Sequence, residues 1–102
     1  MFYEPGKSGH GLPHDPFKSL VVPRPIGWIS TYAKDGTPNL APYSFFNAVG
    51  FAPPMVIFSS GTRRPDHSDK DSALNVEETG AFVVNMVSYD LRDQMTLSAE
   101  EV

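Results

Sequence analysis

The sequence contains no cysteine among its 102 residues. Disulfides, thiolate zinc sites, iron–sulfur clusters and a cysteine nucleophile are therefore excluded. Proteins without disulfides are typical of reducing compartments, so we expect a cytoplasmic protein. The chain also has no window of about twenty uninterrupted apolar residues, and its N-terminus lacks the basic-then-apolar order of a signal peptide. We therefore expect no membrane partner.

Positive charge is scarce as well. The chain has 8 Lys+Arg against 12 Asp+Glu, which gives a formal net charge of −4, and its pI is about 5.1. A general nucleic-acid binder needs an electropositive face, so this balance argues against such a partner. Long helices and central strands are disfavoured, because proline, at 10 residues, has about twice its average share. The length fits one domain over residues 1–102, which we expect to be mainly β and rich in turns.

Apolar segments between turns predict four short strands. They cover residues 25–32, 39–43, 55–60 and 81–88. Asp35-Gly36 joins the first two as a hairpin, and the two prolines of the second place it at a sheet edge or bulge. The fourth has few polar residues, which favours burial of both its faces. The segment 44–50 is apolar but too short to predict a helix.

Capping residues and apolar spacing predict short helices. Asp71 and Gly80 bound one helix at about 71–79, and the tail predicts another at about 90–99. Asp15-Pro16 predicts a helical turn before the first strand, and the spacing of Ser98–Glu101 is that of a capping box for a further helix. Four strands are few for a closed barrel. Either a partner chain supplies the missing strands, or the polypeptide is a fragment.

A first candidate site combines small hydroxyls, cations and a helix start. Its residues are Ser59, Ser60, Arg63, Arg64, Lys70, Asp71 and Ser72. Hydroxyls, cations and free helix N–H groups at one place make an anion site, and a phosphate needs several donors at once. The alternative is that Asp71 or Ser72 only caps the helix and the arginines are surface charges. Spacing alone favours this alternative.

A second candidate site is the segment Asn39–Ala48. Its prolines release backbone amides from ladder pairing, and Ser44 and Asn47 place polar groups beside aromatic surface. Such a segment can hold a flat heteroaromatic ring. The alternative is an irregular edge strand with Phe45 or Phe46 in the core. A single tryptophan on a strand, Trp28, is usually a packing residue and only secondarily a ring partner.

Five short motifs occur in a fixed order along the chain. They are the segments 24–31 (RPIGWIST), 39–47 (NLAPYSFFN), 53–56 (PPMV), 70–72 (KDS) and 78–85 (ETGAFVVN). The ordered set resembles the flavin reductase-like, FMN-binding split-barrel family, which includes flavoredoxin-type proteins, over nearly the whole chain.

The resemblance implies a Greek-key split β-barrel that forms a homodimer and binds FMN near the dimer interface. Family domains are longer, so we expect an incomplete, N-terminal part of such a domain. The implied function is an oxidoreductase that transfers electrons from NADH or NADPH to flavin, or onward to another acceptor. The alternatives are a flavin-binding module without turnover and a dimeric structural remnant of the fold. Hydride chemistry would belong to the flavin, so no catalytic side chain and no metal are expected.

The same resemblance assigns roles to particular residues. The segment 44–47 would hold the isoalloxazine and ribityl region, with Trp28 near the ring, and the first candidate site would surround the phosphate. The expected cofactor-binding residues are Trp28, Tyr43, Ser44, Phe45, Asn47, Ser59, Ser60, Arg63, Lys70, Asp71 and Ser72.

Overall fold

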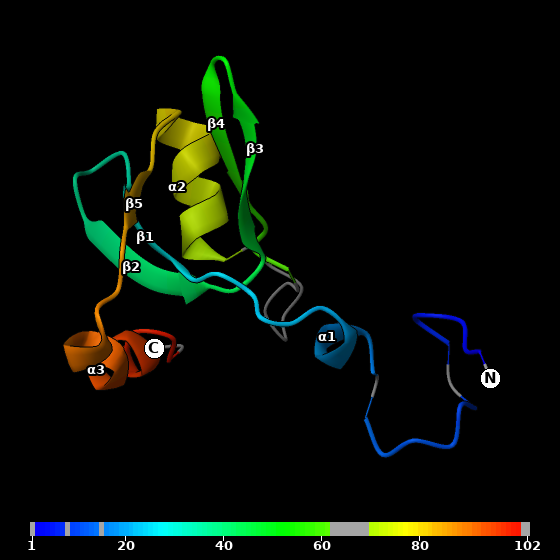
Figure 1. The fold of residues 1–102 in the computed structure, drawn as a ribbon. Helices are drawn as coiled ribbons and strands as arrows, with labels where there is room; N and C mark the ends of the chain where they lie inside the picture. The colour runs from blue at the N-terminus through cyan, green and yellow to red at the C-terminus, as the bar shows by residue number, and fades with distance from the viewer. Residues whose placement is uncertain (1, 8, 15, 62–69, 101–102) are drawn as a thin grey trace.

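The computed structural model of the chain describes residues 2–7, 9–14, 16–61 and 70–100. Within them, the elements follow in the order α1 (Phe17–Leu20), β1 (Gly27–Tyr32), β2 (Pro38–Tyr43), β3 (Phe46–Phe51), β4 (Pro54–Phe58), α2 (Asp71–Thr79), β5 (Val83–Asn85), the 3-10 turn η1 (Tyr89–Leu91) and α3 (Arg92–Leu97). The expectation of a mainly β chain with a few short helices is confirmed (Figure 1).

β1 is the central strand of an antiparallel sheet with the order β2-β1-β5. The predicted hairpin between β1 and β2 is confirmed: the Ala33 amide donates to the Thr37 carbonyl, and Gly36 adopts a φ of 87° that suits glycine. β2 lies at the edge of the sheet, as its two prolines predict, because proline has no amide to donate to a second neighbour.

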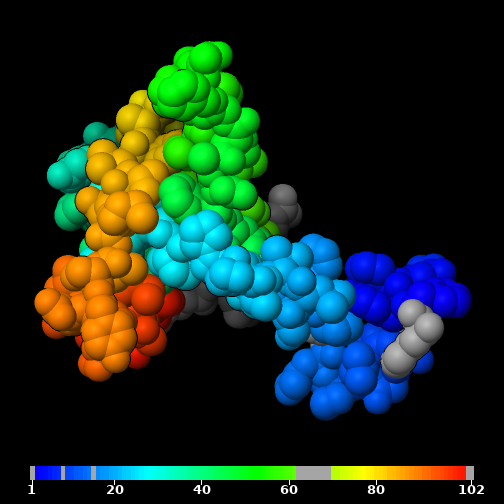
Figure 2. Space-filling model, in the orientation of Figure 1, coloured from blue at the N-terminus to red at the C-terminus, as the bar shows by residue number. Residues whose placement is uncertain are grey.

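The sequence predicts no element for the segment 44–50. Most of this segment belongs to a strand, β3, which pairs antiparallel with β4. The register shifts between Ala48 and Gly50, so Val49 has no partner on β4. A bulge of this kind breaks the period-two alternation by which a strand is predicted. The pairing of Phe46 with Phe58 sets the start of this hairpin, which projects from the body of the molecule (Figures 1 and 2).

α2 packs on β1 and β2 through polar side chains. Asn75 donates from Nδ2 to Thr31 Oγ1 at 3.0 Å, and Asn39 donates from Nδ2 to Ser72 Oγ at 2.9 Å. The predicted helix is confirmed with one correction: Lys70 is the N-cap and makes no side-chain capping bond. Asp71 is instead the first helical residue, where a carboxylate faces the positive end of the helix dipole.

The small core lies between the strands β1 and β2 and the base of the β3–β4 hairpin, where Phe46 pairs with Phe58. Ile29 is fully buried, and the rings of Tyr43, Phe58 and Phe82 form a row with centroid distances of 5.1 and 4.9 Å. Gly27 lies against the Phe46 ring so closely that a Cβ there would be 2.7 Å from a ring carbon. Only a glycine therefore allows β3 to approach β1 at this point.

The chain after α2 departs from its sequence prediction. β5 spans three residues instead of 81–88, because its pairing with β1 covers Val83–Asn85. Val83 is exposed rather than buried. Ser98 ends α3 and does not begin a new helix. Its hydroxyl is already used: it donates to the Met95 carbonyl and accepts from Trp28 Nε1.

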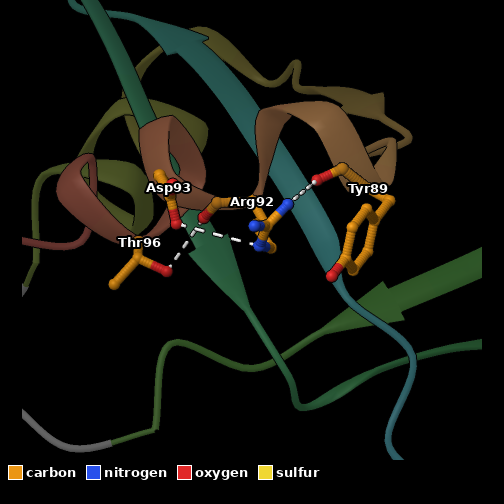
Figure 3. Close-up of polar contacts among 4 residues, drawn as sticks. All are labelled: Tyr89, Arg92, Asp93 and Thr96. Atoms are coloured by element: carbon orange, nitrogen blue, oxygen red, sulfur yellow. Dashed lines mark hydrogen bonds and ion pairs between the residues drawn. The ribbon is translucent and has the colours of Figure 1, made fainter.

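α3 is held by short-range contacts that Figure 3 displays. The Arg92 guanidinium lies 4.1 Å from the Tyr89 ring centroid and donates to the Tyr89 carbonyl, and the Thr96 hydroxyl donates to the Arg92 carbonyl. The predicted helical tail is therefore present, preceded by η1.

The N-terminal residues extend away from the sheets, with α1 between them and β1 (Figures 1 and 2). Pro16 is the N-cap of α1, whereas Asp15, the predicted cap, lies outside the described residues. Among the helices of the described segments, none has both the length and the apolar character that a bilayer crossing requires.

Candidate functional site

One cavity joins the two candidate sites that the sequence suggests. It measures about 290 Å³ and is lined by Lys18, Pro42, Tyr43, Ser44, Phe45, Ser59, Ser60, Gly61 and Lys70. Part of the segment proposed to hold a flat ring, Ser44 and Phe45, and part of the set proposed to hold a phosphate thus border the same space. The second part consists of Ser59, Ser60 and Lys70. A single elongated ligand can reach both groups.

Main-chain pairing explains why these segments meet. The Ser59 amide donates to the Phe45 carbonyl at 2.9 Å, which fixes the end of β4 beside the β2–β3 connection. Gly61, at a φ of 69°, turns the chain immediately afterwards, and its amide donates to Ser59 Oγ at 3.1 Å. Lys70 enters from the start of α2, and its Nζ lies 5.9 Å from the Tyr43 ring centroid.

The described residues that line this cavity carry positive charge, although the chain is acidic. Of the described residues that line it, Lys18 and Lys70 carry charge, and none is acidic. Ser59 and Ser60, which carry hydroxyls, also line it. Cations and hydroxyl donors together suit an anion such as a phosphate. The segments described contain no group of three or more His, Asp or Glu side chains that could hold a metal ion.

Two further predicted residues, Asp71 and Ser72, border a neighbouring cavity of about 150 Å³. Lys70 and Tyr43 line both spaces, so the two cavities lie side by side. Ser72 has none of its surface exposed, and its oxygen accepts the bond from Asn39. The structure thus uses this hydroxyl in the contact between helix and sheet, and its role toward a phosphate stays a prediction.

The remaining described residues of the prediction, Trp28 and Asn47, do not line the cavity of about 290 Å³. Trp28 packs toward α3, and its Nε1 donates to Ser98 Oγ at 2.9 Å. Asn47 is exposed, and its Oδ1 accepts from the Ala48 amide. It borders a third cavity of about 340 Å³, which shares Ser44, Phe45 and Ser59 with the cavity of about 290 Å³. Arg63 lies outside the described residues.

The sequence prediction missed two cations beside Phe45. Arg24 donates from Nε to Ser44 Oγ at 3.1 Å, and its Cζ lies 5.5 Å from the Phe45 ring centroid. Lys18 Nζ lies 5.8 Å from the same centroid. Arg24 is the first residue of the first ordered motif, 24–31. Its place in that motif is the feature of the sequence that could have identified it as a site residue. Lys18 lies in a segment that carries no motif.

Comparison with known proteins decides the family. The sequence profile of the flavin reductase like domain matches residues 19–101. The chain belongs to this family. Membership makes a flavin the expected small-molecule partner of the fold, and it confirms the resemblance seen in the ordered motifs.

Individual proteins are similar to this chain in sequence or in structure. An uncharacterized protein of Aquifex aeolicus is 51% identical over 82 residues, which cover 80% of this chain and 41% of that protein. The crystal structure of nitrilotriacetate monooxygenase component B from Bacillus cereus superposes with a TM-score of 0.80 at 28% identity, over 100% of this chain and 50% of that one.

A third comparison concerns the fold alone. A Shewanella frigidimarina protein, described as a flavin reductase with a split barrel domain, gives a TM-score of 0.65 at 22% identity, over 78% of this chain and 37% of that one. The fold is thus that of flavin reductase-like split-barrel proteins. The chain spans half or less of the length of these relatives.

Proposed function

We propose that the chain binds FMN in the cavity between Ser44–Phe45 and the Ser59–Ser60 turn. One observation carries the proposal: the ring segment, the hydroxyls and Lys70 all border the same space. The size of that space, about 290 Å³, lies near the lower end of the range of small-molecule sites. The activity we propose is electron transfer from NADH or NADPH to flavin, or onward to another acceptor.

The residues of the cavity suit distinct parts of this ligand. The hydroxyls of Ser59 and Ser60 and the Lys70 ammonium would donate to the phosphate, because charge-assisted bonds of this kind recognise phosphate oxygens. The rings of Phe45 and Tyr43 offer flat apolar surface, and Ser44 offers a polar group beside it. When bound, the flavin supplies the hydride chemistry, and the protein supplies its placement.

The proposal includes association of two copies of the chain. The β3–β4 hairpin exposes several large apolar side chains, namely Val49, Phe51, Met55, Val56 and Ile57. Contiguous exposed apolar surface is typical of interaction sites, and a homodimer would cover it. Because NADH and NADPH are intracellular reductants, we place the reaction in the cytoplasm.

The test of the binding site compares FMN with riboflavin, which lacks the phosphate. Lys70→Ala should weaken FMN binding about 10-fold or more, since a bond to a charged group contributes about 1.5–3 kcal/mol, and should change riboflavin binding little. Lys34→Ala removes an exposed lysine from the β1–β2 turn and is the matched control. Quenching of flavin fluorescence measures both affinities. Equal losses for the two ligands would contradict the phosphate assignment.

A second measurement separates the catalytic proposal from its alternatives. The absorption spectrum of the chain as isolated should show flavin, and NADH or NADPH should bleach it. Bound flavin without oxidation of either nucleotide would favour a binding module without turnover. Association of copies that is indifferent to flavin, with no flavin bound, would favour a structural remnant.

A further inference from the structure

Two cations that precede β1 are tied to the proposed flavin site by direct contacts. Arg24 donates from Nε to Ser44 Oγ at 3.1 Å, and its Nη1 donates to the Lys18 carbonyl. One guanidinium therefore joins α1 to the β2–β3 connection. The fork geometry of arginine allows this double contact, which a lysine at position 24 could not reproduce.

The Lys18 side chain reaches the same cavity as Lys70. Its Nζ lies 5.8 Å from the Phe45 ring centroid, and Lys18 lines the cavity together with Ser59 and Ser60. Arg24 is also near this ring, since its Cζ lies 5.5 Å from the same centroid. Contacts of a cation with an aromatic face hold the cation in place at modest strength.

We propose that Lys18 is a second phosphate-binding cation, and that Arg24 is the positioning residue that directs Lys18 to the cavity. This inference rests on the proposed binding of FMN. A phosphate monoester carries a charge of about −1.5 to −2 near pH 7, so a second cation beside Lys70 would balance more of that charge. Among the described residues that line the cavity, Lys18 is the other cation. The N-terminal segment thereby becomes part of the binding site.

The direct test removes one charge at a time. Lys18→Met should weaken FMN binding about tenfold, as expected for loss of one charge-assisted contact, and leave riboflavin binding within twofold. Lys34→Met is the matched control and should leave both affinities unchanged. Lys18→Arg should restore FMN binding, because it keeps the charge. Lys18 is exposed, so its replacement is not expected to unfold the chain.

Arg24→Lys tests the positioning role, since this change keeps the charge but loses the fork. We expect weaker FMN binding and a smaller difference between FMN and riboflavin than in the parent chain. Combining Arg24→Lys with Lys18→Met should add little to the FMN loss of Lys18→Met alone, because both act through the same ammonium. Additive losses would overturn the positioning role.

The outcomes distinguish this inference from the proposed function. If Lys70→Ala weakens FMN binding but Lys18→Met does not, Lys18 is no phosphate ligand and the proposed FMN site stands. If the parent chain binds neither flavin, the proposed function fails, and the inference fails with it. Selective loss of FMN in both variants supports both.

Discussion

The sheet–helix unit (β1, β2, β5 and α2) and the β3–β4 hairpin differ in how they treat similar side chains. Ile29, on β1, is fully buried, whereas Ile57, on β4, is 54% exposed. In the sheet–helix unit even polar groups are buried and paired, as in the bond from Asn75 to Thr31. The hairpin instead displays apolar side chains to solvent, with Phe51 90% exposed.

The comparison shows how the proposed site is built. The sheet–helix unit contributes Tyr43 and Lys70, and the hairpin side contributes Ser59 and Ser60. A ligand in this cavity would contact both parts. Since a ligand that binds only the folded state stabilises it, flavin should hold the hairpin against the sheet–helix unit.

The largest expected effect comes from truncating the two isoleucines. Ile29→Ala should lower the free energy of unfolding by about 2–5 kcal/mol, because it leaves a cavity in the core. Ile57→Ala, its matched control in the hairpin, should cost less than about 1 kcal/mol in the monomer, since its side chain is half solvated there. Urea unfolding monitored by circular dichroism measures both. Similar losses would show that the hairpin is as well covered as the core.

The next effect concerns two glycines without positive φ. At Gly27, an added Cβ would meet Phe46 ring carbons at 2.7 and 2.8 Å, so Gly27→Ala should cost about 1–3 kcal/mol by overpacking. At Gly50, in β3, an added Cβ would meet its nearest atom at 3.4 Å. Gly50→Ala should therefore change stability by no more than about 0.5 kcal/mol. A neutral Gly27→Ala would contradict the close approach of β3 to β1.

The sheet–helix unit and the β3–β4 hairpin also differ in how much of their structure could be predicted from the sequence. The hairpin at Asp35-Gly36 and the α2 helix ending at Gly80 were predicted, because local turn and cap chemistry determines them. β3 was missed, since the bulge at Val49 and the exposure of apolar side chains on the hairpin leave no alternating pattern. The prediction that 81–88 is one strand was wrong, because apolar composition does not show over which residues a strand pairs with its neighbour.

The candidate site was predictable to a similar degree. The sequence placed Ser44, Ser59 and Lys70 in two separate constellations, and the fold joins them in one cavity. It could not show that the Ser72 hydroxyl is engaged by Asn39, because that bond joins residues 33 positions apart. Lys18 was missed because its segment carries no motif, and its place beside Ser59, Ser60 and Lys70 appears only in the folded chain.

A smaller effect is expected from the polar contact between α2 and the sheet. Asn75→Ala should cost about 1–2 kcal/mol, because it leaves the buried Thr31 hydroxyl without its donor. Thr31→Val in the same background should then cost little more, since the bond is already lost. Asn47→Ala, an exposed asparagine of the hairpin, is the control and should be near neutral. Additive losses from Asn75→Ala and Thr31→Val would contradict a shared bond.

The smallest effect is a pH dependence located at the β1–β2 turn. The Thr37 amide donates to Asp35 Oδ1 at 2.9 Å, and this bond, strengthened by one from the Thr37 side chain, holds the pKa of the Asp35 carboxyl below its usual value. The folded state therefore favours the ionised form, so its contribution to stability is complete above the pKa of the unfolded chain. It is lost as the pH falls through the lowered pKa.

Asp35→Asn should remove this acid-side dependence while leaving the hairpin register intact, because an amide oxygen can still accept the Thr37 bond. NMR titration of the Asp35 carboxyl measures the pKa directly, and unfolding at a series of acidic pH values compares the two chains. A carboxyl that titrates at or above its usual value would show that the turn is not closed by this bond. The expected change is small, because Asp35 is exposed and solvent screens its charge.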